Sequence, residues 1–303
     1  MKHLKFIKRL KAFGQFYNWI NPFTGTVFML HRVVAERSVI NDNRLLEITP
    51  GFLEATILKY KNEGYEFVSL DSMLEKQKTY SDKPYVCFTF DDGYRDNLGV
   101  ALPLFEKYQI PFAIYITTDF IDQKSFLWWY VLEAIVKQNT KVSLSNGMTY
   151  LCRTSDEKNE VFHLIKRELQ KHSMVSEQLF YQYLDESYQA GTYEQPEMLN
   201  WKEVWLLQNN PLCTIASHGV THSSLTLLTD DALIYELSES KKIIEERTGV
   251  VVNHFAYPYG DMNKKVAEAV KNAGYLSAVR IDGGMQRKFQ QPYFLKRSWL
   301  FES

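Results

Sequence analysis

Two adjacent carboxylates, Asp91 and Asp92, directly follow the apolar run 85–90 (YVCFTF) and precede Gly93. Taken alone, Asp-Asp-Gly is typical of a turn. At the end of a buried strand, however, such a pair can divide two tasks: one carboxylate binds a divalent cation and its neighbour accepts a proton. The two charges would repel each other if both were free, and a bound cation removes that penalty.

A second motif supplies nitrogen ligands. Residues 217–222 read SHGVTH, in which His218 and His222 are separated by three residues. This spacing allows two imidazoles to share one Zn²⁺, and a carboxylate from a neighbouring strand would complete a His₂Asp site with a position left for water. The zinc-protease pattern requires glutamate directly after the first histidine. Gly219 stands there, which disfavours a zinc protease.

The elements that must position these side chains alternate along the chain. Short apolar runs predict strands at residues 26–33, 66–70, 85–90, 111–117, 213–217, 254–257, 276–280 and 293–300, with amphipathic helices between several of them. A helix is expected after Thr49, which can cap it with Pro50 in the first turn. Seven or eight strands in this rhythm favour a closed or nearly closed β/α barrel over a doubly wound sheet.

In a parallel barrel the carboxyl ends of the strands form the active face. The predicted strand ends carry polar residues that would converge on one rim: His31, Asp91, Asp92, His218, Tyr259 and Arg297. Residues 122–196 interrupt the strand and helix rhythm, which predicts a helical insertion between two barrel strands.

The first 22 residues are basic and carry Leu4, Ile7 and Leu10 on one helical face. They predict an amphipathic helix separate from the domain at 23–303, suited either to an anionic membrane surface or to packing on its own domain. The segment lacks the apolar core of a signal peptide, which predicts a cytoplasmic protein with an option of peripheral contact at the inner membrane face.

Composition excludes some classes of partner. Lys and Arg (35) nearly cancel Asp and Glu (36), and this net charge of -1 gives no indication of nucleic-acid binding. The three cysteines are odd in number and widely spaced, which predicts buried free thiols in a reducing compartment.

Taken together, the motifs resemble those of the polysaccharide deacetylases with a NodB homology domain, carbohydrate esterase family 4. Residues 89–93 (TFDDG) resemble the first motif of that family, 218–222 (HGVTH) the second and 256–260 (AYPYG) the third. The resemblance spans roughly residues 26–303 apart from the insertion. It implies a distorted (β/α)7–8 barrel and a metal-dependent hydrolase. Such an enzyme removes acetyl groups, above all N-acetyl, from an acetylated sugar, polysaccharide precursor or glycoconjugate. Because no signal peptide is recognised, we expect a role in surface polysaccharide biosynthesis.

The resemblance also implies roles for individual residues. Asp91 would be the general base that activates the attacking water. Asp92, His218 and His222 would bind the divalent metal, with Zn²⁺ as the first expectation. The backbone N–H of Tyr259 would contribute to the oxyanion hole.

The sequence departs from the family pattern at several positions. Gly219 replaces the usual Ser or Thr of the second motif, and Ala256 stands where many members carry an arginine that steadies the base. The fourth motif has no counterpart in residues 276–285 (LSAVRIDGGM). Arg297 replaces the histidine that is the usual general acid, and arginine cannot donate a proton at neutral pH. His31 is our candidate for a replacement acid or an orienting group, the alternative being a histidine bonded to a loop carbonyl.

Two other functions stay open at this point. A carbohydrate-binding or scaffold homologue that has lost catalysis would explain the missing arginine and histidine, although the intact metal ligands and Asp91 oppose it. A hydrolase of a non-sugar amide or imide would keep the same metal chemistry on another substrate. Metal content, acetate release and substrate profiling separate these alternatives.

Overall fold

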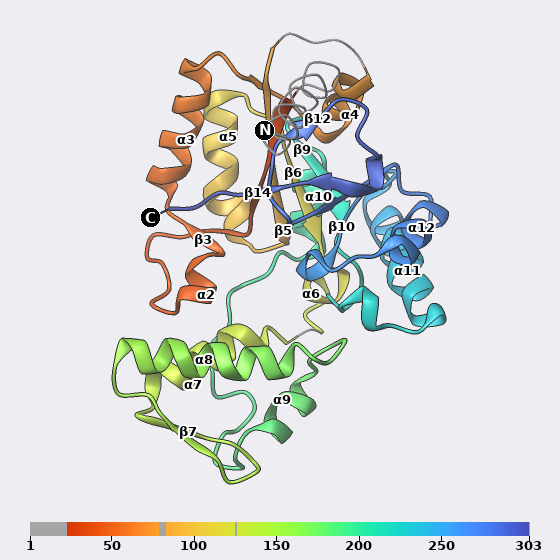
Figure 1. Cartoon of the computed structure of the whole chain (residues 1–303). Coiled ribbons are helices and arrows are strands. Elements are labelled where there is room, and N and C mark those ends of the chain that lie inside the picture. The colour runs from red at the N-terminus through yellow and green to blue at the C-terminus, as the bar shows by residue number, and fades with distance from the viewer. Residues whose placement is uncertain (1–22, 79–82, 125, 303) are drawn as a thin grey trace, which may run out of the picture.

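The computed structural model describes residues 23–78, 83–124 and 126–302. At its centre is a sheet that curves into a nearly closed barrel, with helices on the outside and a separate lobe below it (Figure 1). The strands follow one another around the barrel as β12 (Gln286–Arg287), β1 (Phe23–Leu30), β5 (Tyr85–Asp92), β6 (Phe112–Ile116), β9 (Cys213–Ser217), β10 (His254–Ala256), β11 (Ser277–Arg280) and β13 (Leu295–Lys296). The predicted α/β barrel is confirmed.

The barrel closes at its C-terminal strands. β13 pairs in parallel with β11, whereas the next strand, β14 (Ser298–Trp299), pairs in parallel with β1. The backbone therefore passes from one edge of the sheet to the other at Arg297, whose N–H donates to the carbonyl of Arg280 at 3.0 Å. The sequence predicted one strand over 293–300. The structure has instead a 3-10 turn, η4 (Pro292–Phe294), and two short strands with different partners.

Helices cover the outside of the barrel, and side-chain hydrogen bonds explain where two of them begin. They are α3 (Pro50–Asn62), α4 (Leu70–Lys78), α5 (Leu102–Tyr108), α6 (Thr118–Ile121), α10 (Trp201–Gln208), α11 (Asp230–Thr248) and α12 (Lys264–Asn272). Thr49 caps α3 by accepting from the N–H of Phe52, as predicted. The predicted strand at 66–70 is wrong in length: β4 (Glu66–Phe67) is short, because the Ser69 hydroxyl accepts from the N–H of Ser72 and starts α4.

Shorter elements complete the barrel. They are β2 (Arg32–Val33), α2 (Asn41–Arg44), β3 (Glu47–Ile48), the π-helical turn η1 (Asn97–Ala101), and the 3-10 turns η2 (Leu225–Leu227) and η3 (Pro258–Gly260).

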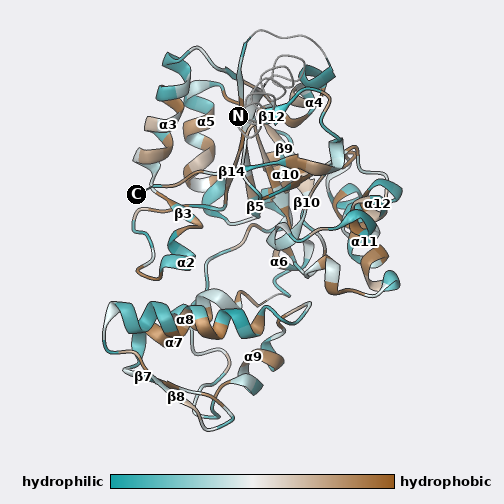
Figure 2. Cartoon of the chain, in the orientation of Figure 1, coloured by the Kyte–Doolittle hydropathy of each residue, from teal (hydrophilic) through white to brown (hydrophobic). Residues whose placement is uncertain are grey.

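Alternation along the strands divides the core into two layers. In β5, Phe88 and Phe90 pack outward with Phe105 of α5, whereas Tyr85 and Cys87 lie in the cluster that fills the barrel. All eight residues of β5 are buried, as expected of a strand covered on both faces. In Figure 2 the central strands are brown over part of their length and white or teal elsewhere. Because side chains alternate, the inward row of β5 continues from Cys87 to the polar residues at its carboxyl end.

Residues 122–196 form a lobe, and most of a third hydrophobic cluster lies in it, joined by Ile40, Tyr94, Phe120 and Met198 from outside the lobe. The lobe contains α7 (Trp128–Gln138), β7 (Lys141–Ser143), β8 (Thr149–Leu151), α8 (Ser155–Leu169) and α9 (Glu177–Tyr183). The antiparallel hairpin of β7 and β8 was not foreseen in a segment predicted to be helical. α8 turns its apolar residues toward the lobe and a hydrophilic side toward the barrel (Figure 2).

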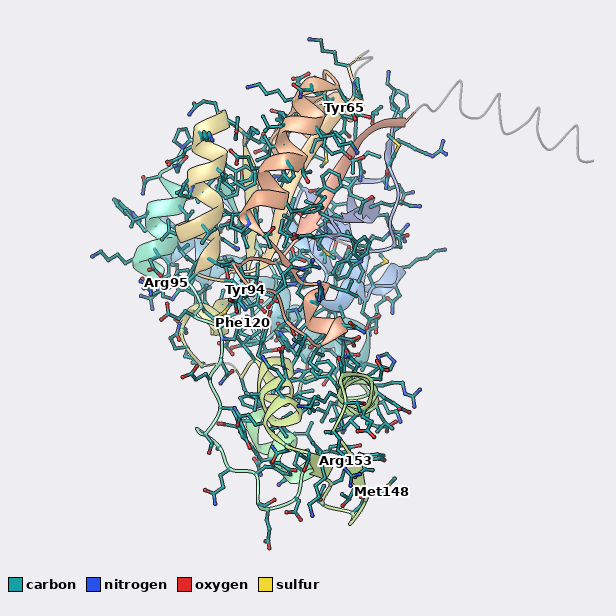
Figure 3. All side chains as sticks on the ribbon, turned by 90° about the vertical axis from the view of Figure 1, so that its left-hand side faces the viewer. Tyr65, Tyr94, Arg95, Phe120, Met148 and Arg153 are labelled. Atoms are coloured by element: carbon teal, nitrogen blue, oxygen red, sulfur yellow. The ribbon has the colours of Figure 1, made fainter. Side chains whose placement is uncertain are left out.

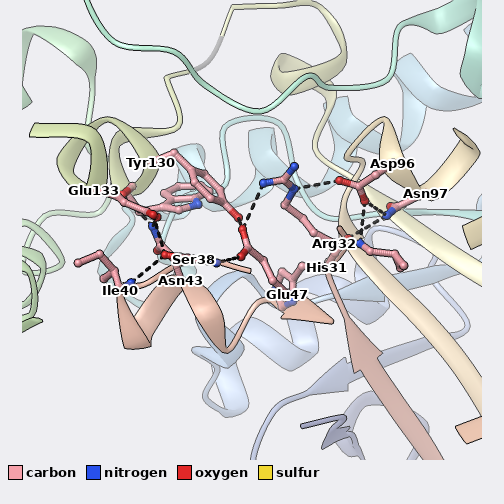
Figure 4. Close-up of polar contacts among 12 residues, drawn as sticks. His31, Arg32, Ser38, Ile40, Asn43, Glu47, Asp96, Asn97, Tyr130 and Glu133 are labelled. Atoms are coloured by element: carbon pink, nitrogen blue, oxygen red, sulfur yellow. Dashed lines mark hydrogen bonds and ion pairs between the residues drawn. The ribbon is translucent and has the colours of Figure 1, made fainter. Parts of the chain in front are cut away.

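A buried polar network joins this lobe to the barrel (Figure 4). The carboxylate of Glu133 on α7 accepts from the Ser38 hydroxyl and from the Asn43 side-chain amide, each at 2.6 Å. The N–H of Ser38 donates in turn to Glu47 at 2.5 Å, and Glu47 is paired with Arg32 at 3.2 Å. Satisfied buried networks of this kind fix one arrangement of the elements that they connect.

Two other predictions concern the ends of the chain and its cysteines. Residues 1–22 lie outside the described residues, so the basic helix and its membrane contact stay predictions. Within the described ranges, the helices are too short or too polar for any of them to span a bilayer. The three cysteines are buried free thiols, as predicted.

Candidate active site

Three potential metal ligands meet at the carboxyl ends of β5 and β9. The structure places Asp92, His218 and His222 so that one ligand atom from each lies within 4.8 Å of the others. Nε2 of His218 is 3.6 Å from Oδ1 of Asp92, and Nε2 of His222 is 3.4 Å from the same oxygen. All three residues are buried. Ligands that are far apart in the sequence therefore converge as the barrel topology requires.

The backbone at Asp92 brings both carboxylates to the same rim. In a regular strand the side chain of Asp92 would point away from that of Asp91. Instead φ of Asp92 is +74°, and both side chains reach His218, with Oδ2 of Asp91 at 3.9 Å from its Nε2. The two aspartates are thus distinguished by their partners and not by the face of the strand.

Arg297 is the partner that distinguishes Asp91. Its fully buried guanidinium donates from Nη1 and Nη2 to the two carboxylate oxygens of Asp91, each at 2.6 Å, and from Nη1 to the Thr89 hydroxyl at 3.2 Å. The guanidinium also lies over the ring of Tyr115, 5.4 Å from its centroid. Bidentate pairs of this kind are strong and fix the plane of the carboxylate.

This pair supplies what the sequence appeared to lack. Ala256 stands at the position where the family resemblance led us to look for the arginine, and its side chain is part of the apolar filling of the barrel. Arg297, which lies between β13 and β14 where the barrel closes, binds Asp91 instead. Sequence reasoning placed Arg297 on the polar rim and noted that it replaces a histidine, but did not pair it with Asp91. An arginine within the apolar run 293–300 was itself a signal, because a buried charge needs a charged partner.

The two carboxylates differ in acidity as well as in contacts. Burial alone would raise the pKa of Asp91, but the charge of Arg297 outweighs it and the pKa falls to about 2. Burial, reinforced by repulsion from Asp91, raises the pKa of Asp92 to about 8. Asp91 is therefore ionised at neutral pH, whereas Asp92 needs a positive charge close by to ionise fully.

Both histidines present the form that binds metal ions. Nδ1 of His218 donates to the carbonyl of Ala256 at 2.8 Å, which leaves the lone pair of Nε2 directed to the site. Burial lowers the pKa of His218 and of His222, so both rings are neutral at pH 7. The ring of His222 packs edge-on against Tyr259, with centroids 4.6 Å apart, and stacks on Phe120 at 5.7 Å.

The loop between the two histidines is held by Glu236 of α11, a residue that sequence reasoning missed. This buried carboxylate accepts from the N–H of Val220 at 2.7 Å, from the N–H of Thr221 at 3.1 Å and from the Thr221 hydroxyl at 2.6 Å. Gly219 has φ of +89°, and a Cβ there would lie 2.9 Å from Oε2 of Glu236. The glycine in the second motif thus has a structural reason.

His31 and Tyr259 line the same cavity of about 200 Å³ as the metal ligands and Asp91. The ring of His31 stacks on Trp299, with centroids 5.8 Å apart, and its Nδ1 has no hydrogen-bond partner among the described residues. Burial lowers the pKa of His31 to about 4. The alternative of a histidine bonded through Nδ1 to a loop carbonyl is therefore not seen. Tyr259 has φ of +57° in the turn η3, which sets its backbone apart from a regular strand.

The donor set fits a divalent cation. In the described part of the chain, Oδ1 of Asp92 is buried without a hydrogen-bond partner, which is costly unless another group compensates. A cation between this oxygen and the two neutral imidazoles would remove the cost and lower the pKa of Asp92 again. One carboxylate with two imidazoles and an open position is typical of catalytic Zn²⁺ sites.

The family assignment follows from comparison with known proteins. The family model described as polysaccharide deacetylase matches residues 78–147 and 157–278, more than half of the chain. The chain therefore belongs to the polysaccharide deacetylase family. It is a hydrolase of the class that acts on carbon–nitrogen bonds other than peptide bonds, and the resemblance seen in its motifs is confirmed.

Individual relatives agree with this assignment. The chain is 23% identical over 261 residues to YxkH of Bacillus subtilis (strain 168), which carries the family's name, covering 85% of this chain and 67% of YxkH. Among solved structures, it superposes on the Streptococcus pyogenes deacetylase PplD, in complex with acetate, with a TM-score of 0.61 and 16% identity over 91% of this chain and 92% of that one. IcaB from Ammonifex degensii gives a TM-score of 0.62 at 15% identity, over 92% and 93%. At these identities the two structures support the fold.

Proposed function

We propose that this protein is a metal-dependent deacetylase that hydrolyses N-acetyl groups of a polysaccharide precursor or glycoconjugate. The observation that carries the proposal is one buried cavity in which a metal-ligand triad, Asp92, His218 and His222, lies beside an ionised carboxylate held by Arg297. The intact ligand triad beside Asp91 opposes a homologue that has lost catalysis. A role in surface polysaccharide assembly stays a prediction from the character of the N-terminal sequence.

Each step of acetyl hydrolysis has a group in this cavity. A divalent cation on the triad, most simply Zn²⁺, would polarise the acetyl carbonyl and lower the pKa of water towards about 7. Asp91, oriented by two hydrogen bonds from Arg297, accepts the proton of the attacking water. The backbone N–H of Tyr259 donates to the oxyanion that forms on the acetyl oxygen. The C–N bond then breaks, acetate forms, and the leaving nitrogen takes up a proton.

The test of this proposal is metal content measured together with acetate release. We expect the purified protein to bind one divalent ion and to release acetate from N-acetylated sugar oligomers. Removing the metal with a chelator should abolish release and adding Zn²⁺ should restore it, because the triad has no other group to polarise the carbonyl. Acetate release that survives complete removal of the metal would contradict the proposal.

We assign His31 the protonation of the leaving nitrogen: its ring is neutral at pH 7, so it would first take up the proton that Asp91 receives from the attacking water and then pass it on. It is the one imidazole lining the cavity outside the metal triad among the described residues, and its Nδ1 is unpartnered. His31→Asn is expected to lower kcat by about 10²-fold on an N-acetyl sugar, the lower end for a lost general acid. On 4-nitrophenyl acetate the loss should be within about twofold, because that leaving group departs without a proton.

The comparison of the two substrates separates an acid from an orienting group. Equal losses on the amide and on the activated ester would show that His31 orients substrate or supports the fold, and would remove its role as acid. Trp299→Phe is the matched control, since it keeps an aromatic ring beside His31 and should leave the ratio of the two rates unchanged.

A further inference from the structure

The metal loop, residues 218–222, carries both imidazole ligands and has no regular secondary structure. It begins where β9 ends at Ser217, and it turns at Gly219 and His222, whose φ angles are +89° and +59°. Because a loop of this kind has no hydrogen-bond ladder of its own, other elements must pair its buried backbone groups. The positions of the two imidazoles therefore depend on residues outside the loop.

One side of the metal loop is bound by the first turn of α6. The N–H of Thr118 donates to the carbonyl of Gly219 at 3.2 Å. The next N–H, that of Asp119, donates to the carbonyl of Val220 at 2.9 Å. Phe120 follows in the same turn and stacks on the second histidine, and Figure 3 shows it at the level between the barrel and the lobe. α6 therefore holds two carbonyl groups of the loop, whereas the N–H groups need acceptors from elsewhere.

The N–H groups of the metal loop depend largely on one carboxylate, that of Glu236 on α11. The first two N–H groups of the loop donate to oxygens at the ends of β6 and β9. Those of Val220 and Thr221 both donate to Oε2 of Glu236, at 2.7 and 3.1 Å, and the Thr221 hydroxyl donates to Oε1 at 2.6 Å. Two of the four N–H groups from residue 218 to residue 221 thus share one acceptor.

Glu236 is itself held in place by contacts that the protein makes alone. Its side chain is buried, and one turn further along α11 the hydroxyl of Ser240 donates to the carbonyl of Glu236 at 2.6 Å. The hydroxyl of Ser217, at the end of β9, donates to that of Ser240 at 2.9 Å. The carboxylate therefore stands on a helix that is bound to the strand from which the metal loop begins. Rigid supports of this kind keep a site in its binding geometry.

We propose that Glu236 is a positioning residue of the metal site. Its hydrogen bonds hold the metal loop so that His218 and His222 face one cation, and they thereby set the affinity for that cation. This rests on the metal binding of the proposed function and adds to it a residue outside the sequence motifs. Loss of a group that orients metal ligands typically lowers metal affinity by about 10- to 100-fold.

Two substitutions separate the hydrogen bonds of Glu236 from its charge. Glu236→Gln removes the charge but keeps an oxygen for both N–H groups, and its NH₂ can donate to the Thr221 hydroxyl, which then donates to the Ser223 hydroxyl 2.6 Å away. Glu236→Asp keeps the charge, but its carboxylate is one methylene shorter and is drawn away from the loop. Competition with a chromophoric chelator measures the dissociation constant of Zn²⁺ for each metal-free protein. We expect it to stay within about threefold of the wild type for Gln and to rise by about 10- to 100-fold for Asp.

A second measurement requires no metal. In the metal-free wild type and in the Gln variant, the amide hydrogens of Val220 and Thr221 should exchange slowly with solvent. In the Asp variant they should exchange at least about tenfold faster, because they have lost their acceptor. Glu203→Asp is the matched control: Glu203 is also a buried carboxylate that accepts from a backbone N–H, but on α10, and its variant should keep the wild-type metal affinity and the slow exchange of both amides.

The outcomes distinguish positioning from the alternatives. A Gln variant that binds Zn²⁺ weakly beside an Asp variant with wild-type affinity would show that the charge of Glu236 acts on the cation, and would overturn the positioning role. Equal affinities in the wild type and both variants would overturn it as well. A wild-type protein that binds no divalent ion would refute the proposed function instead, and the exchange rates would still report whether Glu236 holds the loop.

Discussion

Asp91→Asn is expected to lower kcat/KM for acetate release by about 10²- to 10⁴-fold, the range for loss of a general base. The amide has nearly the shape of the carboxylate, but it cannot accept the proton of the attacking water. The variant should still bind one metal ion, because Asp91 is bound to Arg297 and is not a member of the ligand triad. Steady-state acetate release and metal titration of the same preparation measure the two effects.

The neighbouring carboxylate is the matched control. Asp92→Asn should lose the metal as well as the rate, since its oxygen is the one that faces both imidazoles. If Asp91→Asn lost the metal while Asp92→Asn kept it, the two tasks would have been assigned to the wrong residues. Adjacent positions in the sequence would thus give opposite results in a binding assay and similar results in a rate assay.

Arg297→Ala is expected to lower the free energy of unfolding by about 3–5 kcal/mol, because it leaves the buried charge of Asp91 without a partner. Arg297→Lys keeps one positive charge but loses the second hydrogen bond, and should fall between the wild type and the alanine variant. Denaturant unfolding in the presence of a chelator measures the loss without a contribution from metal binding. Arg280→Ala breaks a partly exposed pair with Asp282 and should cost no more than about 1 kcal/mol.

The pH dependence of this loss has a definite sign. In the wild type the pKa of Asp91 falls from 3.8 to about 2, so the pair stabilises the native state above about pH 4, and this is lost as pH falls through 2. Without Arg297 the burial of Asp91 dominates and raises its pKa. The variant therefore recovers part of its deficit when acid protonates Asp91, and the difference between the two proteins should shrink from pH 7 to pH 4. A difference that grew toward acid pH would contradict the buried pair.

The sequence predicted the site well where regular topology decides the geometry. Carboxyl ends of parallel strands meet on one rim, so the motifs after β5, β9 and β10 were expected to lie together, and the structure places Asp92, His218 and His222 within reach of one ion. The backbone details were not foreseen. Positive φ reorients the side chain of Asp92 where strand periodicity predicts the opposite face, and the loop residues His222 and Tyr259 also have positive φ.

Contacts at the point where β13 and β14 close the barrel could not be predicted from the sequence. Arg297 and Asp91 are separated by 206 residues, and they meet only because β13 and β14 pair with opposite edges of the sheet. Each of these strands has two residues, too few for any period to be read. The same limit applies to Glu133, whose partners Ser38 and Asn43 lie on a distant segment that carries no motif.

Gly219 and Glu236 constrain how this site can change by mutation. The serine or threonine common at position 219 in the family would meet the carboxylate of Glu236 here, and the backbone conformation at 219 is itself one that favours glycine. Shortening Glu236 alone would leave two N–H groups of the metal loop without their acceptor. A single substitution at either position is therefore disfavoured, and the lineage of this chain is held to its own version of the second motif unless both positions change together.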